Sequence, residues 1–167
     1  MLKKIALISA LTFAIQSAAF AQVADKPMFY SGTASAPTDA REAEIASLFD
    51  RWNAALATGN PAEVTKLYAQ DAVLEPTVSN KVRTTPEEIH NYFTSFLKLK
   101  PQGVVNYRQI RVLDENTALD TGVYTFDLTK DGKRQQVQAR YTYVYEKLGG
   151  QWKIINHHSS AMPEQMN

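Results

Sequence analysis

Two ionisable side chains in the second half of the chain have the chemistry of a catalytic base. Asp120 falls on the same face of a predicted strand as Tyr124, because the two positions are an even number of residues apart. A carboxylate and a tyrosine in an apolar pocket can move protons on a substrate. His158 is predicted to share a strand face with Trp152 and Ile154, as a base or donor in a pocket or as a half-buried structural histidine. Asp120 and His158 are therefore the catalytic candidates.

The candidate ligand-binding residues are Tyr124, Tyr143, His158 and His90. A tyrosine that faces a cavity supplies both a stacking surface and a hydroxyl group, although tyrosines on a central strand more often pack in a core. His90 lies beside the apolar stripe of a predicted helix, where it either caps the core boundary or reaches a pocket. No complete catalytic constellation accompanies these residues, so the sequence favours a binding role over an enzymatic one.

The sequence excludes several classes of function. His157 and His158 are adjacent on a predicted strand and point to opposite faces, so they cannot bind one metal ion, and no other metal-ligand spacing occurs. The absence of cysteine excludes disulfides, iron–sulfur clusters and thiol nucleophiles. There is no G-x-S-x-G motif, phosphate-binding loop or dinucleotide fingerprint. Lysine and arginine total 18 against 17 acidic residues, which gives no basic field for nucleic acid. We expect no metal and no cofactor.

The N-terminus has the layout of a secretory signal peptide. Lys3 and Lys4 precede an apolar stretch, which ends in the A-x-A pattern Ala19-Phe20-Ala21. The stretch is shorter than the roughly 20 residues that span a membrane, which argues against an anchor. The sequence therefore predicts cleavage after Ala21, a periplasmic or secreted protein, and no membrane contact after cleavage. Residues 22–38, rich in small residues and proline, are predicted to form a flexible arm.

Residues 39–163 are predicted to form one domain. Helix starts of the capping-box or proline type occur at Asp39, Asn60 and Thr85, and a short strand covers residues 71–76. Segments rich in Val, Ile, Tyr and Thr follow, separated by turn residues, at about 104–113, 117–129, 134–147 and 151–160. Gly122, in mid-strand, indicates a bend. The pattern predicts an α+β fold in which a curved, cone-shaped antiparallel sheet packs on three N-terminal helices, with a pocket at its wide end.

Three segments carry a resemblance to a known superfamily. They are Ile89-His90-Asn91-Tyr92-Phe93, the strand Arg140-Tyr141-Thr142-Tyr143-Val144-Tyr145, and the ending Gly150-Gln151-Trp152 with His158 and Ser160. With the order of the elements, they resemble the nuclear-transport-factor-2-like (SnoaL-like) superfamily over roughly Glu42 to Pro163. Within it the chain is most similar to SgcJ/EcaC-type bacterial proteins and to the association domain of calcium/calmodulin-dependent protein kinase type II.

The resemblance implies a cone-shaped fold, a deep pocket, and self-association through the sheet face into a dimer or larger homo-oligomer. It places Tyr124 and Tyr143 where the kinase hubs have arginines, and it matches His90 and His158 to hub histidines. We therefore expect an exported homo-oligomer that binds a small apolar or aromatic molecule. The alternatives are an isomerase, cyclase or hydratase of SnoaL type, which shares the fold, and a pure oligomerisation module.

Overall fold

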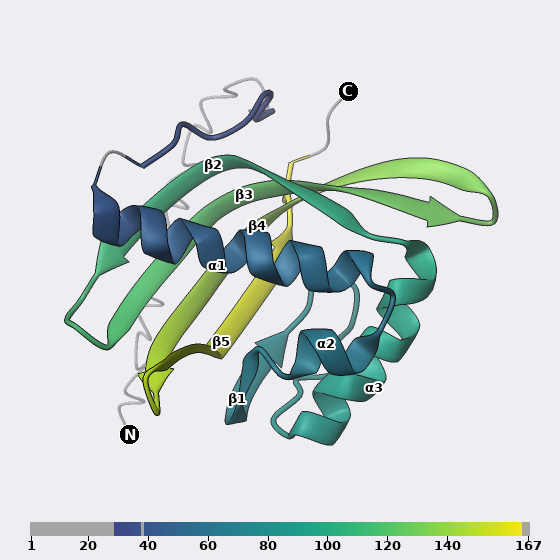
Figure 1. The fold of residues 1–167 in the computed structure, drawn as a ribbon. Coiled ribbons are helices and arrows are strands. Elements are labelled where there is room, and N and C mark those ends of the chain that lie inside the picture. The colour runs from purple at the N-terminus through teal and green to yellow at the C-terminus, as the bar shows by residue number, and fades with distance from the viewer. Residues whose placement is uncertain (1–28, 38, 165–167) are drawn as a thin grey trace, which may run out of the picture.

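The computed structural model describes residues 29–37 and 39–164, and within them the predicted α+β fold is confirmed. The first half holds α1 (Ala40–Ala57), α2 (Pro61–Thr65), β1 (Tyr68–Glu75), α3 (Pro86–Phe96) and the 3-10 turn η1 (Leu97–Leu99). The second half holds β2 (Gln102–Val112), β3 (Thr117–Lys130), β4 (Lys133–Leu148) and β5 (Gln151–Ala161). The sheet is strongly curved, and the helices gather on one of its faces (Figure 1).

Each α-helix begins at the position that the sequence predicts. The Asp39 carboxylate caps α1 by accepting hydrogen bonds from two backbone N–H groups of the first turn, and the Asn60 side chain caps α2 by accepting the backbone N–H of Ala62. The Thr85 hydroxyl accepts the backbone N–H of Glu88 at the start of α3. Gly59, with a φ of +67°, follows the end of α1, where a left-handed residue turns the chain away.

The five strands form one sheet in the order β1-β5-β4-β3-β2. The three pairs among β2 to β5 are antiparallel, as predicted, whereas β1 lies parallel to β5 at the sheet edge. The predicted alternation along β4 is confirmed, because Ala139, Tyr141, Tyr143 and Tyr145 are all buried on the face that the helices cover. Trp52 and Phe49 of α1 pack against this face, so the core lies between the sheet and the helices.

The predicted bend at Gly122 has a structural cause on the neighbouring strand. Asn106 is an extra residue in β2, because Val105 pairs with Tyr124 while Tyr107 pairs with Val123. Such a bulge bends a strand and increases its twist. It brings the carbonyl oxygen of Tyr107 to 1.9 Å from where a Cβ atom of Gly122 would lie. Only glycine fits here, because any side chain would collide with the bulged strand.

Residues 29–37 run beside the outer side of the sheet. The backbone N–H of Ala34 donates to the carbonyl oxygen of Val105 (2.8 Å), and the Gln138 side chain donates to the carbonyl of Tyr30 (2.9 Å). Part of the predicted arm is thus attached to the domain, while the predicted signal peptide lies outside the described residues.

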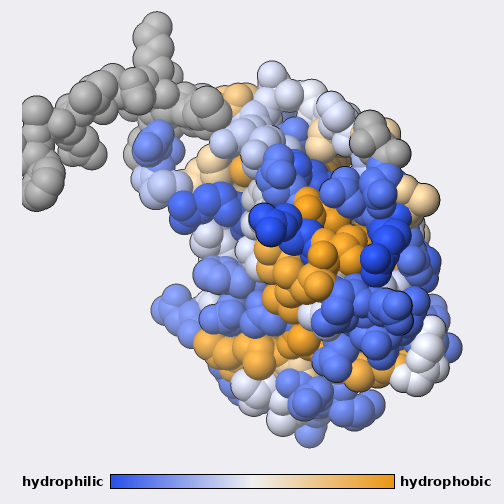
Figure 2. Space-filling model, turned by 90° about the vertical axis from the view of Figure 1, so that its left-hand side faces the viewer, coloured by the Kyte–Doolittle hydropathy of each residue, from blue (hydrophilic) through white to orange (hydrophobic). Residues whose placement is uncertain are grey.

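In the described part of the chain no helix is both long and apolar enough to cross a bilayer. The view in Figure 2 shows hydrophobic patches framed by hydrophilic side chains.

Candidate functional site

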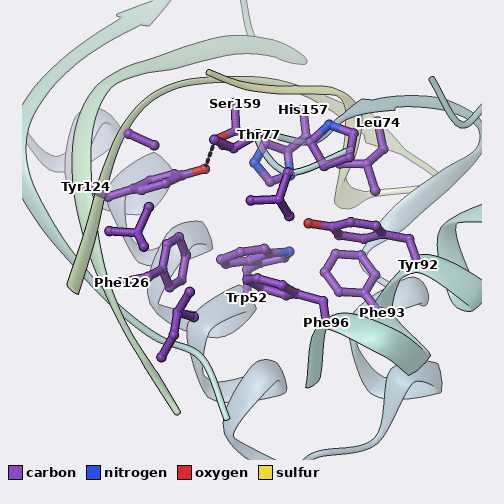
Figure 3. Close-up of a pocket in the computed structure, with 15 residues that line it drawn as sticks. Trp52, Leu74, Thr77, Tyr92, Phe93, Phe96, Tyr124, Phe126, His157 and Ser159 are labelled. Atoms are coloured by element: carbon purple, nitrogen blue, oxygen red, sulfur yellow. Dashed lines mark hydrogen bonds between the residues drawn. The ribbon is translucent and has the colours of Figure 1, made fainter. Parts of the chain in front are cut away.

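A pocket lies between the covered face of the sheet and the helices. Its side chains converge from several elements, among them Trp52 of α1, Phe93 of α3, Tyr124 of β3 and His157 of β5 (Figure 3). Val78, which is 64% exposed in the loop after β1, marks the mouth. The cavity volume is about 40 Å³, room for a few water molecules, so a larger guest must extend into the mouth or displace a wall. None of the lining side chains carries a formal charge.

Aromatic rings form a large part of the pocket wall. The ring centroid of Trp52 lies 6.2 Å from that of Phe93 and 6.1 Å from that of Phe126, and both pairs meet edge to face. Tyr124 and Phe126 meet at 4.7 Å in the same geometry. Edge-to-face contacts at these distances are favourable for aromatic pairs and hold the rings in place. The walls therefore form a fixed apolar surface, to which a flat or apolar molecule could bind.

A chain of hydroxyl groups lies on one side of the pocket. The Tyr124 hydroxyl donates to the Ser159 hydroxyl, which is in turn hydrogen-bonded to the Thr77 hydroxyl (Figure 3). Burial raises the pKa of Tyr124 well above its ordinary value, so this phenol stays protonated. From the opposite side the Tyr92 hydroxyl points into the pocket, and burial raises its pKa to about 12. These groups can donate or accept hydrogen bonds but do not ionise near neutral pH.

His157 is the one aromatic nitrogen heterocycle besides Trp52 among the residues that line the pocket. Its Nδ1 lies 2.9 Å from the hydroxyl oxygen of Tyr68, which also accepts the indole N–H of Trp52 at 3.1 Å. Tyr143 stacks on the imidazole with ring centroids 4.1 Å apart. Burial, the larger cause, and the neighbouring His158 together lower the pKa of His157 to about 3. The ring is therefore neutral near pH 7.

A β-bulge in β5 places His157, and not His158, on the pocket side. Val144 pairs with Asn156, but Tyr145 pairs with Ile154, so Ile155 is an extra residue. The bulge reverses the alternation beyond it, because side chains on a strand repeat every two residues. The predicted face of His158 was therefore wrong: the side chain is exposed and lines a shallow hollow on the outer side of the sheet.

Asp120 lies inside the domain and is held by two partners. Its Oδ1 accepts the Tyr141 hydroxyl at 2.9 Å, and its Oδ2 lies 3.3 Å from Nε of Arg108. The residue is 0% exposed. Burial, the largest cause, raises its pKa to about 6, although Arg108 and Tyr141 act in the opposite direction. The predicted shared face with Tyr124 is confirmed by the burial of both, but Asp120 is not among the residues that line the pocket.

The structure separates the other predicted site residues. Tyr124 lines the pocket, whereas Tyr143 lies one layer behind it, fully buried between Trp52 and His157. His90 is half-buried on the far side of α3, in a separate hollow with residues of α2 and β1. Of the four predicted ligand contacts, only Tyr124 reaches the pocket, and Tyr143 supports it through His157.

Sequence reasoning missed His157 as a pocket residue and Arg108 as a largely buried cation. Both face inward because a bulge precedes them, at Ile155 in β5 and at Asn106 in β2. In β5 one signal was present, since the adjacent apolar residues Ile154 and Ile155 already break a strict alternation. The β2 bulge has a weaker signal, the glycine at position 122 on its partner strand.

The described residues offer no metal centre. Among residues 29–37 and 39–164, no group of three or more His, Asp or Glu side chains is placed to hold a metal ion. The pocket instead combines aromatic walls, hydroxyl groups and a neutral imidazole. This chemistry suits recognition of an uncharged molecule by stacking and hydrogen bonding.

The fold and the pocket define a class of small α+β domains in which a curved sheet wraps over helices and leaves a cavity between them. The family profile of the calcium/calmodulin dependent protein kinase II association domain matches residues 41–163. The chain belongs to this family, which confirms the resemblance seen in the sequence. A solved structure from Xanthomonas campestris, described as a candidate domain of this kind, is 61% identical with a TM-score of 0.81. The match covers 83% of this chain and 99% of that one.

More distant structures share the fold. A candidate scytalone dehydratase from Novosphingobium aromaticivorans is 15% identical with a TM-score of 0.64, over 72% of this chain and 83% of that one. A nuclear-transport-factor-2-like protein with a cystatin-like fold from the same organism is 12% identical with a TM-score of 0.62, over 75% and 83% of the two chains. At these identities the likeness concerns the fold alone. A comparison with curated proteins gave no match.

Proposed function

We propose that the protein is an exported, non-catalytic homo-oligomeric domain that binds a small apolar or aromatic molecule in the pocket between sheet and helices. The observation that carries the proposal is the pocket itself, whose lining combines aromatic rings and hydroxyl groups and has no charged side chain. Export rests on the signal pattern that ends at Ala21.

The absence of catalysis is supported by the placement of the two candidate bases. The Asp120 carboxylate is hydrogen-bonded to Tyr141 and paired with Arg108, and it does not line the pocket. His158 is exposed on the outer side of the sheet. Neither group lines the cavity, whereas a general base must lie within hydrogen-bond reach of the proton that it takes from a bound substrate.

Self-association is supported by the family and by the outer side of the sheet. The family to which the chain belongs is one of association domains. Val104 and Tyr107, large apolar residues on the outer side of β2, are 45% and 43% exposed in the single chain. Apolar side chains left uncovered on a sheet surface are typical of protein–protein contacts.

Native mass spectrometry of the protein isolated from the periplasm, without added ligand, tests the proposal. We expect a chain that begins at Gln22, a defined oligomer, and an additional small mass on its subunits. An oligomer with empty subunits would favour a pure oligomerisation module. A chain that stays uncleaved, or a bare monomer, would contradict export or self-association.

Two variants on one strand separate the pocket from the assembly. Ala139 lines the pocket and is 2% exposed, so Ala139→Leu fills the cavity. Thr142 lies on the outer side of the same strand, so Thr142→Lys places a charge on the exposed sheet surface. We expect Ala139→Leu to lose the bound mass and keep the oligomer, and Thr142→Lys to lose the oligomer. Thermal unfolding of both variants confirms that each is folded.

A further inference from the structure

One buried polar atom of the pocket-lining side chains has no partner. Nε2 of His157 is buried, and no hydrogen-bonding group within the described chain reaches it. Buried side-chain nitrogen atoms are almost always hydrogen-bonded in folded proteins, so the unpaired Nε2 of a residue that lines the pocket calls for a partner that the described chain does not supply. The other ring nitrogen, Nδ1, is engaged by Tyr68 on the side away from the pocket.

The hydrogen bonds behind the ring determine which nitrogen carries the proton. The Tyr68 hydroxyl oxygen accepts the indole N–H of Trp52, which can only donate. If the hydroxyl group donates its own hydrogen to Nδ1 of His157, it both accepts and donates a hydrogen bond. Among the linked side chains of Trp52, Tyr68 and His157, only Nε2 of His157 then lacks a partner. A neutral imidazole has one N–H, so the proton lies on Nε2. Burial, which lowers the pKa of His157, keeps the ring in this neutral form.

The imidazole is also fixed in orientation. Tyr143 stacks on one face at 4.1 Å, and Trp52 meets the ring edge-on at 5.4 Å, so the ring cannot turn away from the cavity without breaking both contacts. Figure 3 shows it between Tyr124 and Tyr92. The Tyr124 hydroxyl already donates to Ser159, whereas Nε2–H has no acceptor and is held in one direction by the stacked rings, unlike the Tyr92 hydroxyl, whose hydrogen can rotate about the C–O bond.

We propose that the pocket selects an uncharged apolar or aromatic molecule with an oxygen acceptor, such as a ketone, and that this oxygen accepts a hydrogen bond from Nε2–H of His157. The proposal rests on the proposed ligand-binding function and specifies its chemistry. A carboxylate or an ammonium group would enter a cavity with no opposite charge on its walls, and such burial is unfavourable.

Nitrogen NMR of the three histidines tests the tautomer directly. We expect one imidazole, assigned to His157 by its loss in His157→Phe, to carry its proton on Nε2 near neutral pH. A proton on Nδ1 would overturn the proposal, because Nε2 would then be an acceptor and the pocket would select donors.

Binding of two molecules of the same shape tests the ligand class. Cyclopentanone and methylenecyclopentane share their ring and differ in whether the exocyclic atom is oxygen or carbon. We expect cyclopentanone to bind the oligomer about fivefold more tightly, the factor for one net neutral hydrogen bond. Cyclopentanecarboxylate, the charged analogue, is expected to bind more weakly than either.

Two histidine variants provide the matched controls. His157→Phe keeps a flat ring without the donor, so the preference for cyclopentanone should fall to less than about twofold. His158→Phe changes the exposed neighbour and should leave the preference unchanged. Equal binding of the two uncharged probes by the unmodified protein, or tighter binding of the carboxylate, would overturn this inference while the pocket remained a binding site. If no probe binds, the proposed function and this inference both fail.

Discussion

Replacing Asp120 by asparagine should change how the stability of the protein depends on pH. The carboxyl group is 0% exposed, and burial raises its pKa from 3.8 to about 6. Arg108, 3.3 Å away, and the Tyr141 hydroxyl favour the ionised form but do not outweigh the loss of hydration. The folded protein therefore binds a proton at this site more tightly than the unfolded chain does.

The magnitude follows from the difference between the two pKa values. Between pH 3.8 and about 6 the folded state holds more protons at Asp120 than the unfolded state, so the free energy of unfolding falls as the pH rises. A shift of about 2 units, at about 1.4 kcal/mol per unit, amounts to ~3 kcal/mol. This contribution is fully present below the unfolded pKa and is lost as the pH rises through the folded pKa.

Urea unfolding of the unmodified protein and of Asp120→Asn, from about pH 3.5 to 7.5, measures this contribution. The other carboxyl groups cancel in the difference between the two proteins, which should decrease by ~3 kcal/mol with rising pH. Asp127→Asn is the control, because Asp127 pairs with Arg134 at the surface. A difference that stays constant or increases with pH would show that the guanidinium of Arg108, and not burial, dominates the pKa of Asp120.

Three further substitutions test the parts of the fold that position the pocket. Gly122→Ala places a Cβ 1.9 Å from the carbonyl oxygen of Tyr107, so it should lower the free energy of unfolding by more than ~3 kcal/mol or prevent folding. Gly132→Ala, in open space, is the control and should lower it by about 1 kcal/mol; thermal unfolding compares the two variants. Tyr68→Phe leaves an indole N–H and an imidazole nitrogen unpaired, and chemical unfolding should show a loss of ~2–3 kcal/mol. Asn53→Ala removes two hydrogen bonds to the backbone of one β2 residue, each 2.9 Å long, and should lower the unfolding free energy by ~1–2 kcal/mol; an unchanged midpoint would show that water replaces them.

The sequence was sufficient to predict the elements of the fold, because their signals are local. Asp39, Asn60 and Thr85 cap the helices through their own side chains, which accept backbone N–H groups two or three residues ahead. The buried residues of β4 alternate regularly because β4 pairs with a neighbour on each side and contains no bulge itself; the extra residue in its pairing with β5 belongs to β5. The parallel pairing of β1 with β5 had no such signal, because it joins segments far apart in the sequence.

The inward-facing polar residues were harder to predict, because the positions of both His157 and Arg108 depend on bulges. One extra residue in a strand reverses the face of every side chain beyond it, until another bulge restores the pattern. In β2 the reversal turns Arg108 toward Asp120, and in β5 it turns His157 toward the pocket. An alternation count that ignores bulges places His158 inward, which is the error that the sequence analysis made.

The same bulges explain how an apolar interior comes to hold polar groups. A strand with perfect alternation would bury only one set of its residues, and in β5 that set begins with the apolar Trp152 and Ile154. Inserting Ile155 before His157 lets the strand keep Ile154 in the core and still present an imidazole and the Ser159 hydroxyl to the pocket. The cost of burying these groups is offset by hydrogen bonds from Tyr68 and Tyr124, which come from other strands of the sheet. Of these β5 groups, only Nε2 of His157 remains without such compensation, and for that reason we expect the ligand to bind there.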